Sequence, residues 1–530
     1  MKDKVFSFGK TFPMVKVFRY GISEFLVYDA KANFMFLLDE SEFQVLMRYV
    51  KDFDAGACIK IWPDKCEVID KFVALHNAGV FLPGPFLKLG ASERESVARK
   101  VDYFCDNIFM RKYVLDITER CNYRCRYCFN SLEPEFRHTT MRQMSKETAR
   151  KAVDYYKALY LSFYTRLNEK KKSQLLEIFA PCLGIYGGEP TLNWDVVTDA
   201  VSYYKSLDWP NYGIDRSILS VTINTNLSHI NDSILSFLVD NDVILFASLD
   251  GPKSENDKNR IFPDGTGTFD VAYENLMKIK YFNEKYYHEK VSILAVEADN
   301  ADAGISDEFL KGLGCQIQHL PQAHFGCFVY DPEAKTDEME RFSDEYISER
   351  MLEIDKYYGV DEDRCLAVLE NLYFLDAIKT DSPVGTDSAD IFLSCPMGVD
   401  NILIGVSGDM HICHKTDGSM PFGNIYNGID RERLIDLYRN YIKTVDCQEC
   451  RSCWAIHNCG CCAAMRMRHG EFRNPDIREC DFYRKSAELN FLFFIEVYKK
   501  YPDLVDKLLA RKKDPHYYRS IVDYNEFIKE

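Results

Sequence analysis

Residues 113–130, YVLDITERCNYRCRYCFN, decide the fold. The first seven form an apolar run of strand length, and three cysteines follow with the spacing C-x3-C-x2-C, Cys121, Cys125 and Cys128. In α/β folds, sites lie at the carboxyl ends of parallel strands. The stretch therefore predicts a buried strand that delivers three thiols to such an edge.

The presence of three thiols rather than four helps to distinguish a zinc site from an iron–sulfur cluster. A closed structural zinc site needs four protein ligands, whereas a 4Fe-4S cluster has four irons that each take one external ligand. Three cysteines in one loop would leave one iron open to bind a substrate. Zinc with a distant fourth ligand is the alternative that the spacing leaves open.

Composition limits the classes of protein. The chain has 530 residues, 46% of them hydrophobic and 28% charged, which is ordinary for several globular domains. It shows neither a long apolar run nor a secretory signal, so we expect a cytoplasmic protein with no membrane association. The net charge of −16 argues against a nucleic-acid partner. In a reducing compartment, clustered cysteines indicate metal ligands before disulfides.

Five further apolar runs follow, each ended by a loop. They cover residues 183–190, 219–226, 243–251 and 292–300, with a weaker run from Cys315, and amphipathic helical sequence separates them. The segment of about 144–180 is helical, with charges interrupting it near residues 169–172. Six strands with helical crossovers predict an α/β fold, a partial (β/α)6 TIM-like barrel.

The loops after these strands carry groups suited to an amino-acid ligand. Gly187 and Gly188 allow close backbone approach, and Glu189 is an acceptor for an ammonium group. Ser248 ends the fourth strand, and Arg260 lies where its guanidinium could bind a carboxylate. Together with an aromatic residue beside the cysteines, these groups indicate a pocket for a zwitterionic amino acid that carries a flat ring.

The strings CNYRCRYCF, YGGEP, INTN and SLDGP, followed by Arg260, resemble the radical S-adenosylmethionine enzymes over residues 112–325. The resemblance implies that Cys121, Cys125 and Cys128 hold a 4Fe-4S cluster whose fourth iron binds S-adenosyl-L-methionine. One electron would then release a 5′-deoxyadenosyl radical, which takes a hydrogen atom from an unactivated carbon. The implied cofactor contacts are Gly187, Gly188 and Glu189 at the amine, Ser248 and Arg260 at the sugar and carboxylate, Tyr127 and Val296 at the adenine, and Asn226 at the third strand end.

A second group of nine cysteines lies between Cys395 and Cys480. It resembles the SPASM extension of the same superfamily, which holds two auxiliary 4Fe-4S clusters and would bring the total to three. Two zinc sites are the alternative. By position, Cys395, Cys413 and Cys462 bind the first cluster, with Cys447, Cys461 or an open position as the fourth ligand. Cys450, Cys453, Cys459 and Cys480 bind the second.

The chain divides into five predicted parts. Residues 1–100 form a winged-helix-like (PqqD-like) leader-peptide recognition domain, with two strands around a turn at residues 30–33 and a helix capped by Ser41; the alternative is a cap that only packs on the body. The other parts are a radical SAM barrel (108–330), a helical linker (331–388), a SPASM domain (389–485) and C-terminal helices (486–530).

These features predict a radical SAM maturase that installs a thioether or carbon–carbon cross-link, or another radical modification, in a ribosomally synthesised peptide. The expected partners are a leader-bearing precursor peptide and an electron donor such as ferredoxin or flavodoxin. An anaerobic sulfatase maturase is an alternative, but in that group an aspartate base follows the cysteine matching Cys413. Here the residue is His414, the candidate proton acceptor. A non-enzymatic iron–sulfur scaffold or redox sensor is the third possibility.

Overall fold

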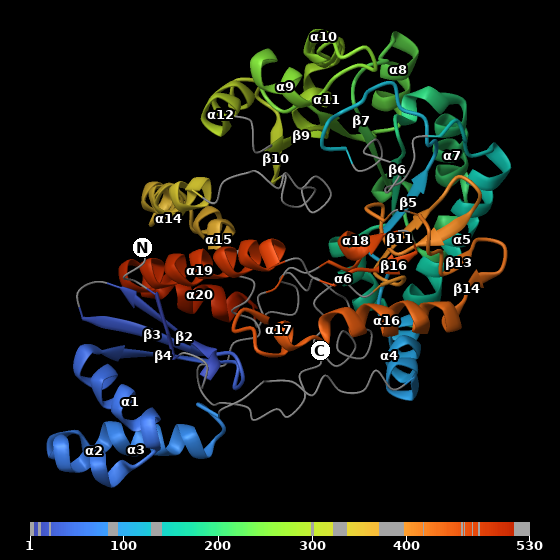
Figure 1. The fold of residues 1–530 in the computed structure, drawn as a ribbon. Coiled ribbons are helices and arrows are strands. Elements are labelled where there is room, and N and C mark those ends of the chain that lie inside the picture. The colour runs from blue at the N-terminus through green and yellow to red at the C-terminus, as the bar shows by residue number, and fades with distance from the viewer. Residues whose placement is uncertain are drawn as a thin grey trace.

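The structure is a computed structural model, shown in Figure 1. It describes residues 5–8, 12–20, 23–82, 94–128, 140–297, 302–321, 337–369, 397–416, 418–456, 459, 462–468, 470–474 and 477–512. Within these ranges, no helix combines the length and the apolar character needed to cross a membrane.

Six parallel strands form the main sheet in chain order, as predicted. β5, β6 and β9 are largely buried, whereas buried and half-buried residues alternate along β7 and β8. In β10, Gln316 and Gln318 are exposed. Neighbouring strands pair in parallel without interruption, so all six carboxyl ends meet at one edge. The strands are β5 (Lys112–Asp116), β6 (Cys182–Tyr186), β7 (Ser220–Thr225), β8 (Ile244–Ser248), β9 (Val291–Glu297) and β10 (Gln316–Pro321).

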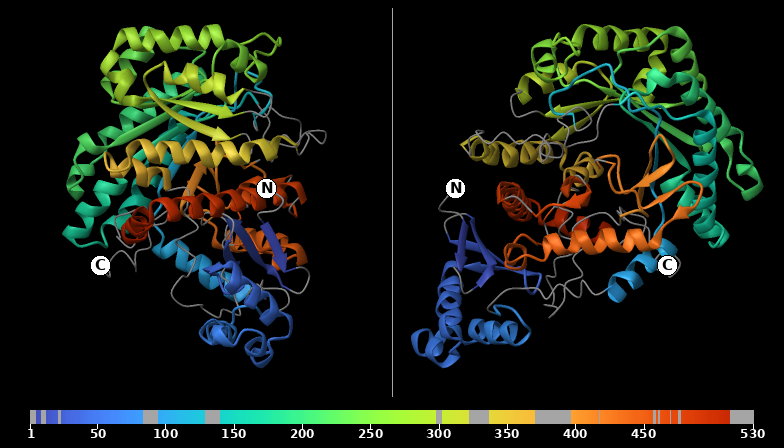
Figure 2. Two further views of the ribbon diagram at one scale, coloured as in Figure 1. Left: turned by 90° about the vertical axis from the view of Figure 1, so that its left-hand side faces the viewer. Right: turned by 45° about the vertical axis from the view of Figure 1, so that its right-hand side comes forward.

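Helices connect these strands and lie along the outside of the curved sheet (Figures 1 and 2). Several begin at a side chain that accepts a backbone N–H, such as Ser145, Asn168 and Asn231. The helical sequence of 144–180 divides where Asn168 caps a new helix. The helices are α5 (Lys146–Tyr164), α6 (Glu169–Phe179), α7 (Trp194–Ser206), α8 (Asp232–Asp240), α9 (Lys253–Asn259), α10 (Phe269–Phe282), α11 (Glu284–Lys290) and α12 (Ala303–Lys311).

The sheet continues beyond the six predicted strands. Strand β11 (Asn401–Ile404) pairs in parallel with β5 on the side opposite β6. Three short antiparallel strands then extend the sheet to ten: β12 (Asp409–His411), β13 (Gly423–Asn424) and β14 (Gly428–Ile429). Part of the cysteine-rich segment is therefore built directly onto the strand that carries the three-cysteine loop.

The N-terminal segment forms an antiparallel sheet with helices on one side. The sheet order is β1 (Val5–Phe8), β2 (Phe12–Tyr20), β3 (Glu24–Asp29) and β4 (Phe34–Asp39), and the helices are α1 (Glu40–Asp52), α2 (Ala55–Ile61) and α3 (Cys66–Asn77). The predicted turn at 30–33 joins β3 to β4. The predicted cap of α1 was wrong: Asp39 accepts the Glu42 N–H, and Ser41 lies inside the first turn.

The N-terminal sheet and the C-terminal helices of the chain pack against each other. The other face of the N-terminal sheet packs on the C-terminal helices, where Phe18 of β2 stacks on Phe491 at 5.1 Å between ring centroids. The left view of Figure 2 shows this contact between the blue sheet and the red helices. The helices and strands of the chain not yet described are α4 (Arg94–Asn107), α14 (Asp337–Tyr357), α15 (Glu362–Leu369), α16 (Arg431–Val445), α17 (Gln448–Arg451), α18 (Ala463–Arg466), β15 (Met467–Arg468), β16 (Glu471–Phe472), α19 (Ile477–Lys500) and α20 (Pro502–Lys512).

Candidate cofactor site

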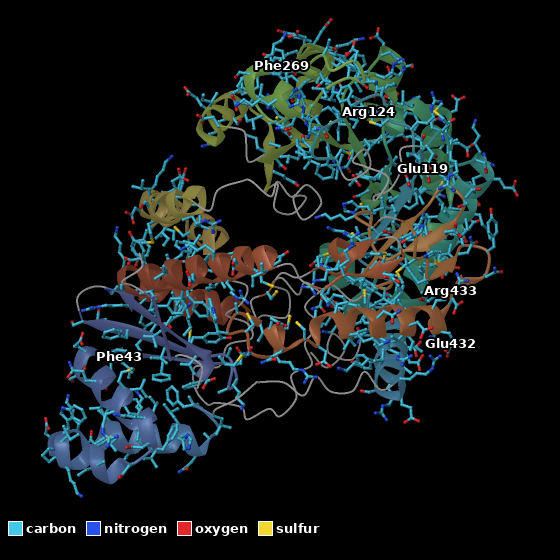
Figure 3. All side chains as sticks on the ribbon, in the orientation of Figure 1. Phe43, Glu119, Arg124, Phe269, Glu432 and Arg433 are labelled. Carbon is cyan, nitrogen blue, oxygen red and sulfur yellow. The ribbon has the colours of Figure 1, made fainter. Side chains whose placement is uncertain are left out.

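The three-cysteine loop leaves the carboxyl end of β5 and is held by backbone hydrogen bonds. Arg124 N–H donates to the Ile261 carbonyl at 2.7 Å, and Arg126 N–H donates to the Asn259 carbonyl at 2.9 Å. Figure 3 marks the loop by Glu119, just before the first cysteine, and by Arg124 within it. The loop is thus fixed to the segment that carries Arg260.

The three thiols are partly buried and close enough for their charges to affect one another. Burial raises the pKa of Cys121 to about 12, and the nearby Glu189 and Cys128 add to the rise. Burial also raises the pKa of Cys125, against the opposing charge of Arg260 and together with the charges of Cys128 and Cys121. Thiolates at this place therefore need a cationic partner, which a metal or cluster supplies.

The loop after β6 packs against the cysteine loop. Gly188 N–H donates to the Thr118 carbonyl at 2.7 Å, and Glu189 N–H donates to the Arg120 carbonyl at 2.8 Å. A Cβ at Gly188 would come within 2.2 Å of the Arg120 carbonyl oxygen. Glycine is required here by the protein's own backbone, whereas the sequence had suggested approach by a ligand.

Glu189 links the ends of two strands. Its carboxylate is fully buried and accepts the Thr191 and Thr225 hydroxyls at 2.6 and 2.7 Å and the Asn226 N–H at 2.7 Å. The Asn226 side chain in turn lies 3.8 Å from the Cys121 sulfur. The predicted residues Glu189 and Asn226 are thus brought next to the first cysteine.

Asp250 organises the other side of the site. One carboxylate oxygen accepts from Arg260 Nη2 and from the Val296 N–H, each at 2.9 Å, and the other accepts from the Tyr127 hydroxyl. The Arg260 guanidinium also lies 5.5 Å from the centre of the Tyr127 ring. Three predicted residues therefore converge on an aspartate for which the sequence suggested no role. Its only signal was its position directly after a strand, two residues past Ser248, which ends β8.

The donor set fits an iron–sulfur cluster with an anionic ligand. Three thiols share one loop, and the buried Nε of Arg260 beside them has no hydrogen-bond partner in the part of the chain that the structure describes. Among the described side chains, no three His, Cys, Asp or Glu residues converge on a single metal ion. In a 4Fe-4S cluster each ligand binds a different iron, so the ligands need not converge on one point. Whether the site suits a cluster therefore depends on the three thiols and on the unpaired Arg260 Nε donor.

The second cysteine group reaches the barrel through Cys413 and His414. Cys413 follows β12, and its sulfur lies 3.7 Å from His414 Nδ1. The imidazole ring lies 5.1 Å from the ring of Tyr186, which ends β6 just before the glycine loop. His414, the predicted proton acceptor, therefore lies beside the last residue of β6.

Four of the other predicted ligands line one small pocket, Cys450, Cys453, Cys459 and Cys480. Burial raises the pKa of Cys480 to about 11, and that of Cys450 rises too, mainly through burial and secondly through a hydrogen bond with Cys447. Cys447 thus contacts this set. Cys462 lies at the start of α18, and Cys395 and Cys461 fall outside the described residues.

Comparison with known proteins gives a family match. Residues 115–283 match the model of the Radical SAM superfamily. The radical SAM cyclopropyl synthase TigE of Paramaledivibacter caminithermalis is 23% identical over 405 residues, which cover 74% of this chain and 76% of that protein.

Two kinds of solved structure are similar in outline. Native anSMEcpe with bound AdoMet is 17% identical with a TM-score of 0.47, covering 73% of this chain and 99% of that one. Streptococcus suis SuiB bound to the precursor peptide SuiA is 14% identical with a TM-score of 0.42, covering 88% and 99%.

Proposed function

The chain carries a domain of the radical SAM superfamily of enzymes over residues 115–283, and on this premise we propose that it is a peptide maturase. It would cross-link or otherwise modify a ribosomally synthesised peptide by hydrogen abstraction. The observation that carries the proposal is the convergence of the three-cysteine loop with the loops of the next strands, through Asn226 on one side and Asp250 on the other.

In this proposal Cys121, Cys125 and Cys128 hold the 4Fe-4S cluster. With S-adenosyl-L-methionine bound, the cluster supplies a carbon radical strong enough to remove hydrogen from an unactivated carbon. The chain's own residues bind and orient: the spare Arg260 donor suits a carboxylate, and the Tyr127 ring presents a flat face. The remaining proposed contacts are Gly187, Gly188, Glu189, Asn226, Ser248 and Val296.

One feature supports a peptide substrate, and a second bears on the kind of product. The N-terminal sheet ends in the strands β1 and β4, and an extended leader peptide can add to such an edge by backbone hydrogen bonds. TigE is named a cyclopropyl synthase, an enzyme that closes a three-membered carbon ring. This similarity favours a carbon–carbon bond over a thioether as the cross-link formed here.

The second cysteine group would hold two auxiliary clusters. Four cysteines around one pocket support the cluster of Cys450, Cys453, Cys459 and Cys480. Cys413, with Cys395 and Cys462, would hold the other, and its neighbour His414 would accept a proton at Nδ1 or Nε2. These clusters would take up the electron left after bond formation. A ferredoxin or flavodoxin would be the electron donor to the enzyme.

The test combines two measurements on anaerobically reconstituted enzyme. Under dithionite, the wild type should form 5′-deoxyadenosine and change the mass of a leader-bearing peptide encoded beside its gene. A triple Cys121→Ala, Cys125→Ala, Cys128→Ala variant should do neither. Turnover by that variant contradicts the cofactor site. Conversion of a cysteine or serine to an aldehyde would instead assign sulfatase maturation.

A further inference from the structure

The hydroxyl group of Tyr123 lies buried in the cysteine loop without a partner. Tyr123 is 2% exposed, and its hydroxyl makes no hydrogen bond to any residue that the structure describes. An unsatisfied buried hydroxyl destabilises the folded state, so buried tyrosines normally have a hydrogen-bond partner. The position of this hydroxyl therefore calls for an acceptor that the described part of the chain does not provide.

The ring has little freedom to turn the hydroxyl elsewhere. It packs edge-on against Phe262, with 5.0 Å between centroids and an interplanar angle of 82°. The Tyr123 N–H donates to the Cys121 sulfur at 3.4 Å, and the next residue is tied to the Ile261 carbonyl. Both the backbone and the ring thus fix the direction of the hydroxyl.

The surroundings of the hydroxyl identify the missing acceptor as a sulfur. Tyr123 lies two residues from both Cys121 and Cys125, and its backbone N–H already donates to the Cys121 sulfur. The Glu189 carboxylate already accepts hydrogen bonds from three other residues, and Arg260 offers only donors. Neither Glu189 nor Arg260 is therefore the acceptor. A cluster bound by Cys121 and Cys125 would bring sulfur acceptors next to Tyr123.

We propose that the Tyr123 hydroxyl donates a hydrogen bond to a sulfur of the 4Fe-4S cluster held by Cys121, Cys125 and Cys128, and so raises the cluster's reduction potential. The inference rests on the proposed cofactor site. A donor to a cluster sulfur stabilises the reduced, more negative state, which makes reduction easier. The other tyrosine of the loop, Tyr127, has a different task, because its hydroxyl is engaged by Asp250.

The experiment compares Tyr123→Phe with the wild type and with Tyr204→Phe. Tyr204 is the matched control, since it is also fully buried with an unpartnered hydroxyl among the described residues, but it lies on α7 against Trp209. Each reconstituted protein is analysed for iron and sulfide. The cluster whose signal is absent from the Cys121→Ala, Cys125→Ala, Cys128→Ala variant is then titrated potentiometrically without S-adenosylmethionine, with its reduced form followed by electron paramagnetic resonance.

We expect a midpoint more negative than wild type in Tyr123→Phe, at equal iron and sulfide, and no shift in Tyr204→Phe. Equal midpoints in Tyr123→Phe and the wild type overturn the inference, as does an equal shift in the control. A loss of S-adenosylmethionine affinity at an unchanged midpoint also overturns it, because the hydroxyl would then face the amino acid.

A second substitution covers the case in which Tyr123→Phe holds less cluster. A ring-fluorinated tyrosine at position 123 is a stronger donor and should move the midpoint to more positive values; no movement overturns the inference. A wild-type protein that assembles no 4Fe-4S cluster refutes the proposed function itself, so the two failures are distinguishable.

Discussion

At the scale of single residues, the site depends on carboxylates whose roles only the folded chain reveals. The sequence identified Glu189 by its motif, but its bonds to Thr191, Thr225 and Asn226 show a carboxylate that joins two strand ends. Asp250 is part of the SLDGP string, but the sequence suggested no function for it. Its partners Tyr127 and Val296 come from distant parts of the chain. Spacing along a sequence cannot show such a convergence.

The buried pair of Asp250 and Arg260 gives the first prediction. Asp250→Asn leaves the guanidinium of Arg260 in a site where both side chains are under 10% exposed. Breaking such a pair costs about 3–5 kcal/mol, so we expect a loss of that order in local stability. Hydrogen exchange of the amides around 248–260 measures it in the apoprotein.

An exposed ion pair nearby serves as the control for this variant. Lys253 and Asp270 are paired, but their side chains are 59% and 72% exposed. Solvent screens such a pair, so Asp270→Asn should cost much less stability than Asp250→Asn. Equal costs for the two variants would contradict the role of Asp250.

At the scale of elements, long apolar runs were predictable and short ones were not. The six strands β5 to β10 were found because each is an apolar stretch of strand length with a loop at its end, whereas β11, which also pairs in parallel, was missed. Strands β13 and β14 have two residues each, too few for a periodic pattern. β13 pairs with the edge of β12, and β14 pairs with β13. The start of α1 was misassigned by two residues, since Asp39 and Ser41 are both good caps and only geometry separates them.

The cap of α1 gives the second prediction. Asp39→Ala removes the acceptor of the Glu42 N–H and should cost about 1 kcal/mol of helix stability, whereas Ser41→Ala should cost little. Hydrogen exchange of the α1 amides in both variants is the measurement. A larger effect from Ser41→Ala would restore the original assignment.

The same cap predicts a dependence on pH. The hydrogen bond from the Glu42 backbone, then that from Ser41, holds the pKa of Asp39 below its usual 3.8. A lowered pKa means that the charged cap stabilises α1 fully above 3.8 and that this part is lost as the pH falls through the folded value. Asp39→Asn, a neutral cap, should show no such loss, and hydrogen exchange at several acidic pH values compares the two.

At the scale of the whole molecule, the N-terminal sheet is part of a core shared with the C-terminal helices. Phe18, Leu26 and Tyr28 of the sheet pack with Phe491 and Trp454. Removal of residues 1–95 would therefore expose an apolar surface as well as remove any leader-binding edge. Loss of peptide processing after that deletion would not by itself identify a recognition domain.

Phe491 gives the prediction at this scale. Phe491→Ala empties a fully buried site and should cost about 3–5 kcal/mol, loosening the N-terminal sheet from α19. Tyr498→Ala, on the same helix but 40% exposed, should cost much less. Limited proteolysis and hydrogen exchange of β2 and β3 report the difference, and equal protection in both variants would refute the shared core.

The pairing of β5 with β11 has a consequence for the newly made chain. Strand β5 ends at Asp116, and its second neighbour begins at Asn401, 401 − 116 = 285 residues later. At about 5–20 residues per second, a ribosome needs roughly 15–60 s to synthesise that interval. During this time one flank of the cysteine-bearing strand stays open, so a delivery system that loads iron while the chain is still growing would meet this strand before its last neighbour exists.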